Sequence, residues 1–322
     1  MAEIIGLVLP FFGLILIGYV TCKLAHQPAE ALGWLNFFIV YVSLPALFFK
    51  LVSRTPIHEL TRIDFIAADL VATYAIFALV FAIGWFVRRN SITDCTVQSL
   101  AGAYGNIGYM GPGLALLAFG EAAAVPVALI FCFENALHFM VAPAMMAIAG
   151  GDDRPRGQVA IDVVKRIAYH PFIVATVIGF AAAAVSFEPP EAVQRLIDYL
   201  AQAAAPCALF AMGVTLALRP FKRIPAEIGY IVPIKLLVHP ILIYVVLSLA
   251  GDFEPLWVYT AMLLASLPTA TNVFVIGQQY GVWQERASAT ILITTVLSVL
   301  TVSALLYAIT TDLLPPDLFP QT

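Results

Sequence analysis

Long runs of apolar residues constrain this sequence more than any other feature. Stretches of about 20 apolar residues recur along the chain, and a helix of that length crosses the roughly 30 Å hydrocarbon core of a lipid bilayer. Charged side chains make up only 11% of the 322 residues, whereas soluble domains carry about 25%. The sequence therefore excludes a water-soluble fold and predicts an all-α polytopic membrane protein.

Ten apolar runs predict ten transmembrane helices. The runs are bounded by charged residues, proline or glycine, and they cover residues 3–22, 32–52, 64–87, 95–119, 124–148, 169–187, 192–218, 226–250, 255–280 and 286–311. A polar stretch at 150–168 separates the first five runs from the last five. We therefore expect two five-helix halves, residues 1–149 and 169–322, joined by a linker, with the first run retained as a span.

The lysine and arginine residues of the loops predict the orientation in the membrane. Eleven of them fall on one predicted side and four on the other. Because short loops rich in lysine and arginine stay in the cytoplasm, the side with eleven, which includes the linker, is expected to be cytoplasmic. Both termini should then lie outside the cytoplasm, in a multi-pass protein of the plasma membrane or bacterial inner membrane.

Several classes of function are disfavoured by missing patterns. The four cysteines stand apart, without the Cys/His spacing of a zinc or iron–sulfur site, so we expect no metal and no cofactor. A net charge of −4 offers no basic face to nucleic acid. The sequence also lacks a nucleotide-binding loop, a zinc-hydrolase motif and a serine elbow, which argues against an ATP-driven pump and an intramembrane hydrolase. We expect no enzyme.

The two halves resemble each other. Shifting the second half back by 161 residues places Pro206 on Pro45 and aligns the last apolar run with the fifth. Since five crossings are an odd number, the second copy must enter the membrane from the opposite side, which predicts an inverted-topology repeat typical of transporters. A chance alignment of two sets of apolar helices is the alternative.

Two of the runs contain residues that break helices. The fourth carries five glycines and Pro112 between residues 102 and 113, and the ninth carries Pro268 within the polar stretch 266–272. Proline removes an intrahelical hydrogen bond, and each glycine costs about 1 kcal/mol relative to alanine, so both runs are expected to unwind locally. Unwound backbone inside a bilayer persists only where protein or a water-filled cavity satisfies its polar groups.

A matched pair of interrupted helices is a pointer to a transporter binding site. Each interruption exposes one helix N-terminus, equivalent to about half a positive charge, and the two together suit an anion such as a carboxylate. The side chains of Asn106, Thr269, Thr271 and Asn272 are expected to add hydrogen bonds to the same ligand. The alternative is that glycine and proline only kink these helices for packing.

Ionisable side chains inside the apolar runs form a second group of candidates. A charge at the centre of a span costs about 2.5–3.5 kcal/mol on insertion scales, so each ionisable group there requires a reason. The candidates are Asp69, Glu134, His138, Lys235 and His239. Glu134 and His138 are four residues apart and share a helix face. These groups suit coupling to H⁺ or to another cation such as Na⁺. The alternatives are that they form neutral, hydrogen-bonded structural pairs, and that the side chain of Asp69 snorkels to the membrane surface.

The segment Gly105-Asn106-Ile107-Gly108-Tyr109-Met110-Gly111-Pro112 resembles the fourth-span motif of the auxin efflux carrier family. The segment Ser266-Leu267-Pro268-Thr269-Ala270-Thr271-Asn272 resembles the C-terminal motif of the same family. The resemblance implies a crossover fold similar to sodium/proton antiporters and bile-acid symporters. In that fold, helices 1, 2, 6 and 7 build a scaffold and often a homodimer surface, and helices 3–5 and 8–10 build the transport domain.

The resemblance also implies a site and a function. It places Asn106 and Pro268 at the crossing of helices 4 and 9, with Gly108, Gly111 and Pro112 beside them and Asn135 as a neighbour. The expected function is secondary transport of a small organic anion, a dicarboxylate or an auxin-like acid, by an alternating-access or elevator mechanism. The alternatives are a sodium- or proton-coupled symporter of another anionic solute and a membrane sensor that binds without transporting.

Overall fold

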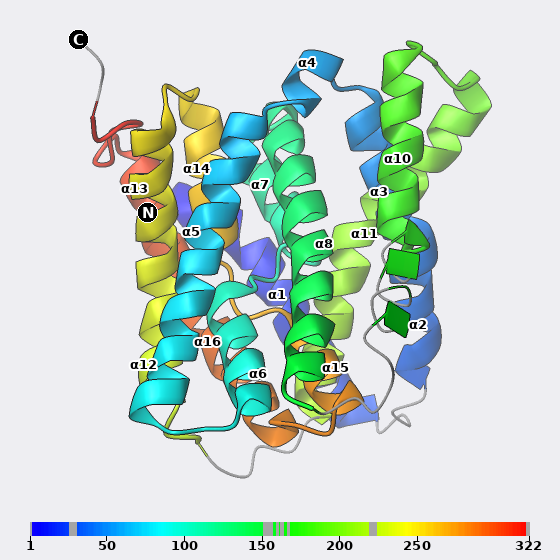
Figure 1. The fold of residues 1–322 in the computed structure, drawn as a ribbon. Helices are drawn as coiled ribbons and strands as arrows, with labels where there is room; N and C mark the ends of the chain where they lie inside the picture. Colours follow the sequence, from blue (N-terminus) through cyan, green and yellow to red (C-terminus); the bar gives the residue numbers. More distant parts are fainter. Residues whose placement is uncertain are drawn as a thin grey trace. The chain divides into compact units, whose positions relative to one another are not determined.

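The computed structural model describes residues 2–25, 31–150, 157–158, 161, 164–165, 168–218 and 224–319 (Figure 1). Most of the linker predicted at 150–168 lies outside the described residues. Within the described ranges the chain is helical, and pairing of the β type is confined to one isolated bridge. The predicted all-α class is therefore confirmed.

Several helices are long and apolar enough to cross a membrane, which supports a polytopic membrane protein. In the described part of the chain, six meet that condition: Leu32–Ser53, Ile63–Val87, Glu121–Ile148, Glu191–Leu218, Ile228–Ala250 and Gln284–Thr310. Three shorter apolar helices are Leu9–Ala25, Ile173–Ala184 and Pro255–Ser266. The ten-helix inverted repeat stays a prediction.

The chain divides into two compact units, each built from separate stretches of sequence. Unit 1 comprises Met1–Ile63, Gly108–Cys132 and Ala168–Arg219, and unit 2 comprises Asp64–Ile107, Phe133–Ile167 and Pro220–Thr322. The helix α8 (Ala124–Ile148) contributes its first residues to unit 1 and the remainder to unit 2.

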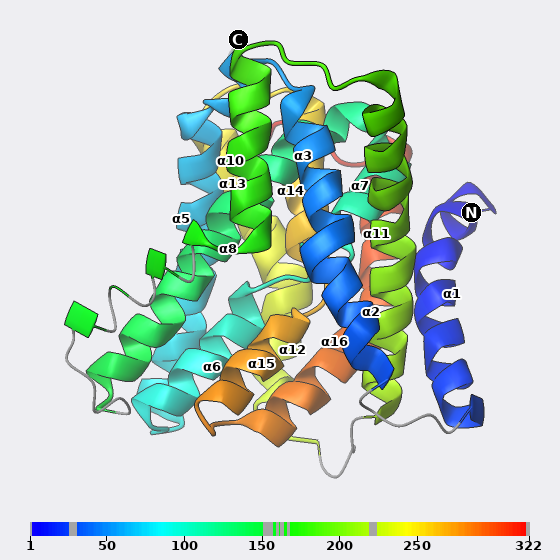
Figure 2. The ribbon, with the colours of Figure 1, turned by 90° about the vertical axis from the view of Figure 1, so that its right-hand side faces the viewer.

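Unit 1 is organised around one long helix, α11 (Glu191–Leu218), which packs against α1 and α3 (Figure 2). Close approach of α1 depends on glycine: a side chain at Gly18 would meet the Phe210 carbonyl, and one at Gly213 would meet the Ile15 carbonyl. The helices of this unit besides α11 and the start of α8 are α1 (Ala2–Ala25), α2 (Leu32–Phe38), η2 (Ile39–Ser43), α3 (Leu44–Ser53), α4 (Ile57–Leu60), α7 (Gly111–Phe119), η4 (Glu121–Ala123) and α10 (Pro171–Ala184).

Unit 2 is organised around α16 (Gln284–Thr310), which contacts α6, α12, α14 and α15. The remaining pairs include α13 with α14 and α6 with α12, both visible in Figure 1. Its helices besides α16 and the end of α8 are α5 (Ile63–Ala82), η3 (Ile83–Val87), α6 (Ile92–Ala103), α12 (Ile228–Pro233), η5 (Ile234–Val238), α13 (His239–Ala250), α14 (Pro255–Ser266) and α15 (Thr271–Gln279).

Two of the long helices contain a wider π-helical turn that ends two residues before a proline. The turn η2 precedes Pro45, and the turn η5 precedes Pro240. A proline cannot donate to the carbonyl four residues earlier and its ring clashes there, and a π turn relieves both problems while the helix continues. The turn η5 contains Lys235, so the local widening sets the position of a buried charge.

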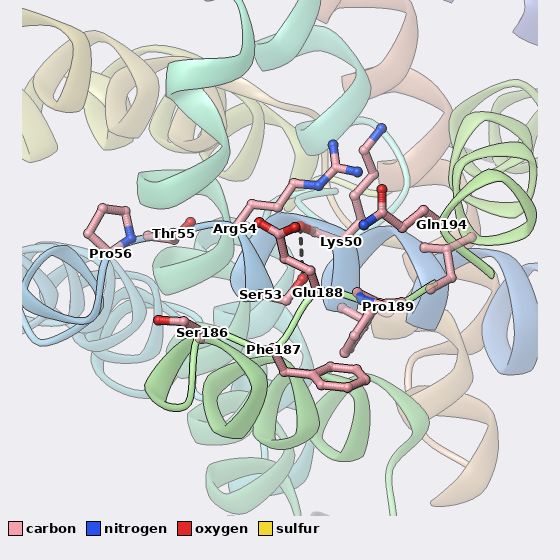
Figure 3. A pocket seen from close by; sticks show the side chains of 13 residues that line it. Lys50, Ser53, Arg54, Thr55, Pro56, Ser186, Phe187, Glu188, Pro189 and Gln194 are labelled. Atoms are coloured by element: carbon pink, nitrogen blue, oxygen red, sulfur yellow. Dashed lines mark hydrogen bonds between the residues drawn. The ribbon is translucent and has the colours of Figure 1, made fainter. Parts of the chain in front are cut away.

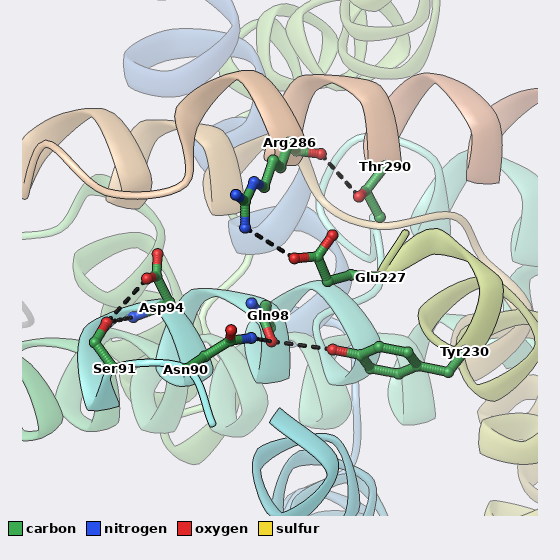
Figure 4. Close-up of polar contacts among 8 residues, drawn as sticks. All are labelled: Asn90, Ser91, Asp94, Gln98, Glu227, Tyr230, Arg286 and Thr290. Carbon is green, nitrogen blue, oxygen red and sulfur yellow. Dashed lines mark hydrogen bonds and ion pairs between the residues drawn. The ribbon is translucent and has the colours of Figure 1, made fainter. Parts of the chain in front are cut away.

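Polar contacts join α6 to α12 and α12 to α16 (Figure 4). Gln98 on α6 accepts hydrogen bonds at Oε1 from Asn90 Nδ2 at 3.2 Å and from the Tyr230 hydroxyl at 3.0 Å. Arg286 of α16 pairs with Glu227, beside α12, at 2.8 Å. Ser91 caps α6 by accepting from the backbone N–H of Asp94. These contacts hold the three helices together, and the other end of α6 reaches the site described below.

Candidate functional site

The two helix interruptions predicted from glycine and proline are present. The helix α6 ends at Ala103 and α7 begins at Gly111, and α14 ends at Ser266 before α15 begins at Thr271. Within unit 2, Gly105 and Thr269 form an antiparallel bridge between the two unwound stretches. The Asn106 N–H donates to the Pro268 carbonyl at 2.8 Å, and the Ala270 N–H donates to the Tyr104 carbonyl at 2.9 Å. We call this paired backbone the crossing.

Threonine hydroxyl groups form hydrogen bonds with buried backbone groups at the crossing. The Thr269 hydroxyl donates to the Ala101 carbonyl at the end of α6 at 2.7 Å, and the Thr269 N–H donates to the Thr294 hydroxyl of α16 at 3.1 Å. Gly105 allows the backbone to approach closely here, since a Cβ there would lie 3.0 Å from the Leu264 carbonyl oxygen. An unpaired buried carbonyl costs about 1–3 kcal/mol, so these contacts permit unwound backbone in an apolar setting.

Tyr104 connects the crossing to the helices around it. Its hydroxyl donates to Asn135 Oδ1 on α8 and accepts from Asn272 Nδ2 at 2.7 Å, at the first turn of α15. Its ring stacks on His138 with centroids 4.2 Å apart. The His138 Nδ1 lies 3.0 Å from the Tyr74 hydroxyl of α5. Two of the predicted residues, Asn135 and Asn272, are therefore joined through a tyrosine.

A cluster of buried ionisable groups lies in the same unit. Asp69 is 2% exposed, Glu134 3%, Lys235 0% and His239 1%. Asp69 is therefore buried and does not snorkel to the surface. Its carboxyl group interacts with that of Glu134, which also interacts electrostatically with Lys235.

A directional chain of hydrogen bonds connects the lysine to Glu134. The Thr73 hydroxyl donates its one hydrogen to Glu134 Oε1 at 2.7 Å, and so accepts from His239 Nε2 at 3.1 Å. The Nδ1 of neutral His239 is then an acceptor, and Lys235 Nζ lies 3.1 Å from it. Lys235 Nζ also donates to the Ala265 carbonyl at the end of α14, at 2.5 Å.

Most of the predicted site residues lie together in unit 2. These are Asn106, Pro268, Thr269, Thr271 and Asn272 at or next to the crossing, with Asn135, Asp69, Glu134, His138 and Lys235 on the helices around it. Gly108, Gly111 and Pro112 belong to unit 1, where Gly111 and Pro112 begin α7 and Gly108 packs against the ring of Phe131.

The sequence did not single out the hydroxyl groups that join these residues. Thr73, Tyr74 and Tyr104 each contact a predicted side chain. Thr73 lies four residues after Asp69 on α5, so it shares a helix face with one of the predicted coupling residues. That spacing was the available signal for Thr73.

Unit 1 contains a separate cavity of about 530 Å³ (Figure 3). Lys50 and Arg54 line it and also pair with Asp198: Lys50 Nζ is 2.8 Å and Arg54 Nη2 is 3.7 Å from the Asp198 Oδ1. Glu188 and the apolar rings of Phe49 and Phe187 also line it. None of the predicted binding or coupling residues is among its lining residues.

Comparisons with known proteins give one consistent result. The family model described as "Membrane transport protein" matches residues 3–148 and 151–306. A Rhizobium meliloti (strain 1021) protein named "Putative malonate transporter" is 72% identical over 320 residues, covering 99% of this chain and 100% of the relative. The "Uncharacterized transporter YfdV" of Escherichia coli (strain K12) is 22% identical over 308 residues, covering 94% and 96%. An "Uncharacterized transporter" of Methanothermobacter thermautotrophicus is 24% identical over 296 residues, covering 90% and 93%.

Proposed function

Because the chain belongs to the auxin efflux carrier family of membrane transport proteins, we propose that it is a secondary transporter of a small organic anion. It is a transporter and not an enzyme. The name of the Rhizobium meliloti relative supports a small dicarboxylate such as malonate as the substrate. The remaining proposals concern where that anion binds and what moves with it.

The crossing is the observation that carries the proposal. The nine-residue helix α15 begins directly after the Gly105–Thr269 bridge, so the N–H groups of its first turn lie next to unwound backbone. A helix N-terminus carries about half a positive charge and binds carboxylates. Asn272 lies in that first turn, and Asn106 lies next to Pro268 through a backbone hydrogen bond. We propose that one carboxylate of the substrate binds here.

The buried cluster supports coupling to a cation. Asp69, Glu134, His138 and Lys235 lie in the unit that contains the crossing. Ionisable groups buried in membrane proteins mark ion and proton pathways by default. We propose that these residues couple anion movement to H⁺ or Na⁺ in an alternating-access, elevator-type cycle.

The two compact units can be compared with the predicted scaffold and transport domain. Unit 1 contains α1, α2–α3, α10 and α11, which correspond to predicted helices 1, 2, 6 and 7. Unit 2 contains α5, α6, the end of α8 and α12–α16, which belong to predicted helices 3–5 and 8–10, whereas α7 and the start of α8, from predicted helices 4 and 5, belong to unit 1. This supports, as a proposal, a scaffold in unit 1 that also forms the homodimer surface and a transport domain in unit 2.

Reconstitution tests the proposed function. Purified protein in proteoliposomes should accumulate radiolabelled malonate, and Asn106→Ala should lower the initial rate about tenfold while the protein still folds, since its backbone contact to Pro268 is kept. Asn36→Ala on α2 is the matched control and should transport normally. Binding of malonate without any flux would favour the alternative function, a membrane sensor that binds its ligand without transporting it. Normal flux in Asn106→Ala would remove this side chain from the mechanism.

A further inference from the structure

Lys235 places a positively charged side chain at the crossing, next to the Ala265 carbonyl. We propose that its ammonium group takes the position of a coupling metal cation, so that this carrier works independently of Na⁺. The inference deepens the proposed transport function by choosing between H⁺ and Na⁺ as the coupled ion. It rests on the contacts of one side chain with backbone and with its neighbours.

The ammonium lies where carbonyl oxygens would coordinate a cation. Its Nζ donates to the Ala265 carbonyl at the C-terminal end of α14, which carries about half a negative charge. A Cβ built on Gly105 would lie 3.3 Å from the same Nζ, so the ammonium also lies against the paired backbone. Unwound carbonyls and the C-terminal ends of half-helices are the groups that coordinate Na⁺ or H⁺ in transporters with broken helices.

The charge of this ammonium is already balanced by its surroundings. The hydrogen bonds run from Lys235 through His239 and Thr73 to Glu134, so a carboxylate terminates the chain. Glu134 also interacts with Asp69 on α5, and two neighbouring buried carboxyl groups repel each other less when one of them holds a proton. With one of the two carboxyl groups protonated, the cluster holds one positive and one negative charge.

A metal cation added to this cluster would have no partner. The ionisable groups around Lys235 are His239 on its own helix, Glu134 and His138 on α8, and Asp69 beside Glu134. The one available carboxylate is already matched, and an uncompensated charge inside a membrane protein is costly. The exchangeable proton between Asp69 and Glu134 remains as the coupled species.

Thermal unfolding of the purified full-length protein tests the ammonium's role without measuring transport. The wild type should unfold at the same temperature in NaCl and in choline chloride of equal ionic strength. Lys235→Ala should unfold at lower temperature, and propylammonium, which replaces the missing atoms, should raise its midpoint by about 3 °C or more in a concentration-dependent way. Lys50→Ala, whose lysine pairs with Asp198 in unit 1, should gain nothing from propylammonium.

A higher unfolding temperature of the wild type in NaCl than in choline chloride would overturn the inference. This comparison uses the wild type alone, so it tests the inference even if Lys235→Ala does not fold. Failure of propylammonium to restore a folded Lys235→Ala would also count against it. In proteoliposomes, malonate uptake should be equal with external Na⁺ or K⁺, and Na⁺-dependent uptake would contradict the proposal. Absence of malonate uptake in both salts would reject the proposed substrate while the unfolding result still stands.

Discussion

At the scale of single residues, the crossing depends on a few hydroxyl groups. Thr269 satisfies the end of α6, and Tyr104 joins the start of α15 to α8. Thr269 donates to a backbone carbonyl at the end of α6, as Lys235 does at the end of α14. Replacing them one at a time separates the stability of the crossing from its ability to bind an anion.

Thr269→Val keeps the side-chain volume but leaves the buried Ala101 carbonyl without its donor. We expect a loss of about 1–3 kcal/mol of stability, because a buried acceptor then goes unsatisfied. Thermal unfolding in detergent measures this as a lowered midpoint. Thr310→Val, at the exposed end of α16, is the control and should leave the midpoint nearly unchanged. Equal midpoints for the two variants would contradict this role of Thr269.

Tyr104→Phe removes one hydroxyl that contacts both Asn272 and Asn135. With Asn272 no longer held, we expect the KM for malonate to rise about tenfold, equivalent to about 1.4 kcal/mol. Uptake kinetics in proteoliposomes measure this change. Tyr41→Phe, at a 57% exposed tyrosine of unit 1, should transport like the wild type. An unaltered KM in Tyr104→Phe would show that Asn272 needs no such support.

The sequence identified charged candidates more readily than hydroxyl ones. Asp69, Glu134 and Lys235 stand out because a charge in an apolar run is costly, and all three are buried in one unit. A threonine in such a run gives no comparable signal, because it can donate to the carbonyl four residues before it in its own helix. Thr290 does so, whereas Thr73 reaches across to another helix.

At the scale of elements, glycine and proline predicted where two helices stop but not how the ends meet. The prolines of the two motifs have different roles. Pro112 lies at the start of α7, whereas Pro268 lies inside its interruption and accepts a hydrogen bond from Asn106. The partner of Gly105 is Thr269, whose N–H also donates to Thr294 of α16, and no pattern in the sequence predicts this register.

Gly105→Ala tests the close approach of backbone at the crossing. The added methyl group would lie 3.0 Å from the Leu264 oxygen and 3.3 Å from Lys235 Nζ, so the backbone at the crossing must shift by a few tenths of an ångström. We expect a lower unfolding midpoint and reduced malonate uptake. Gly229→Ala on α12, where nothing lies within 4 Å, should be neutral or slightly stabilising. An intact Gly105→Ala protein with normal uptake would argue against a tightly paired crossing.

Gly213→Leu tests the pair of α1 and α11 in unit 1. A side chain at Gly213 would collide with the Ile15 carbonyl, and close contact through small residues is how membrane helices associate. We expect a midpoint lowered by several degrees, measured by thermal unfolding in detergent. Gly13→Ala on α1, with open space around it, should unfold like the wild type. Retained stability in Gly213→Leu would mean that α1 does not need to approach α11 this closely.

At the scale of the whole molecule, ten apolar runs predicted a polytopic helical protein. Among the described residues, only six helices are long and apolar enough to cross a membrane. The reason is geometric. The pieces α6 and α14 have 12 residues each, and at 1.5 Å per residue each is only about 18 Å long, short of the roughly 30 Å of hydrocarbon. The sequence also did not reveal that residues 108–132 belong to unit 1, because that depends on long-range packing.

The most direct test of the central claim is an experimental structure of the protein in lipid with saturating malonate. The account predicts density for one carboxylate at the first turn of α15, beside Asn106 and Asn272. Density in the cavity of unit 1 near Lys50 and Arg54 instead, with the crossing empty, would contradict it.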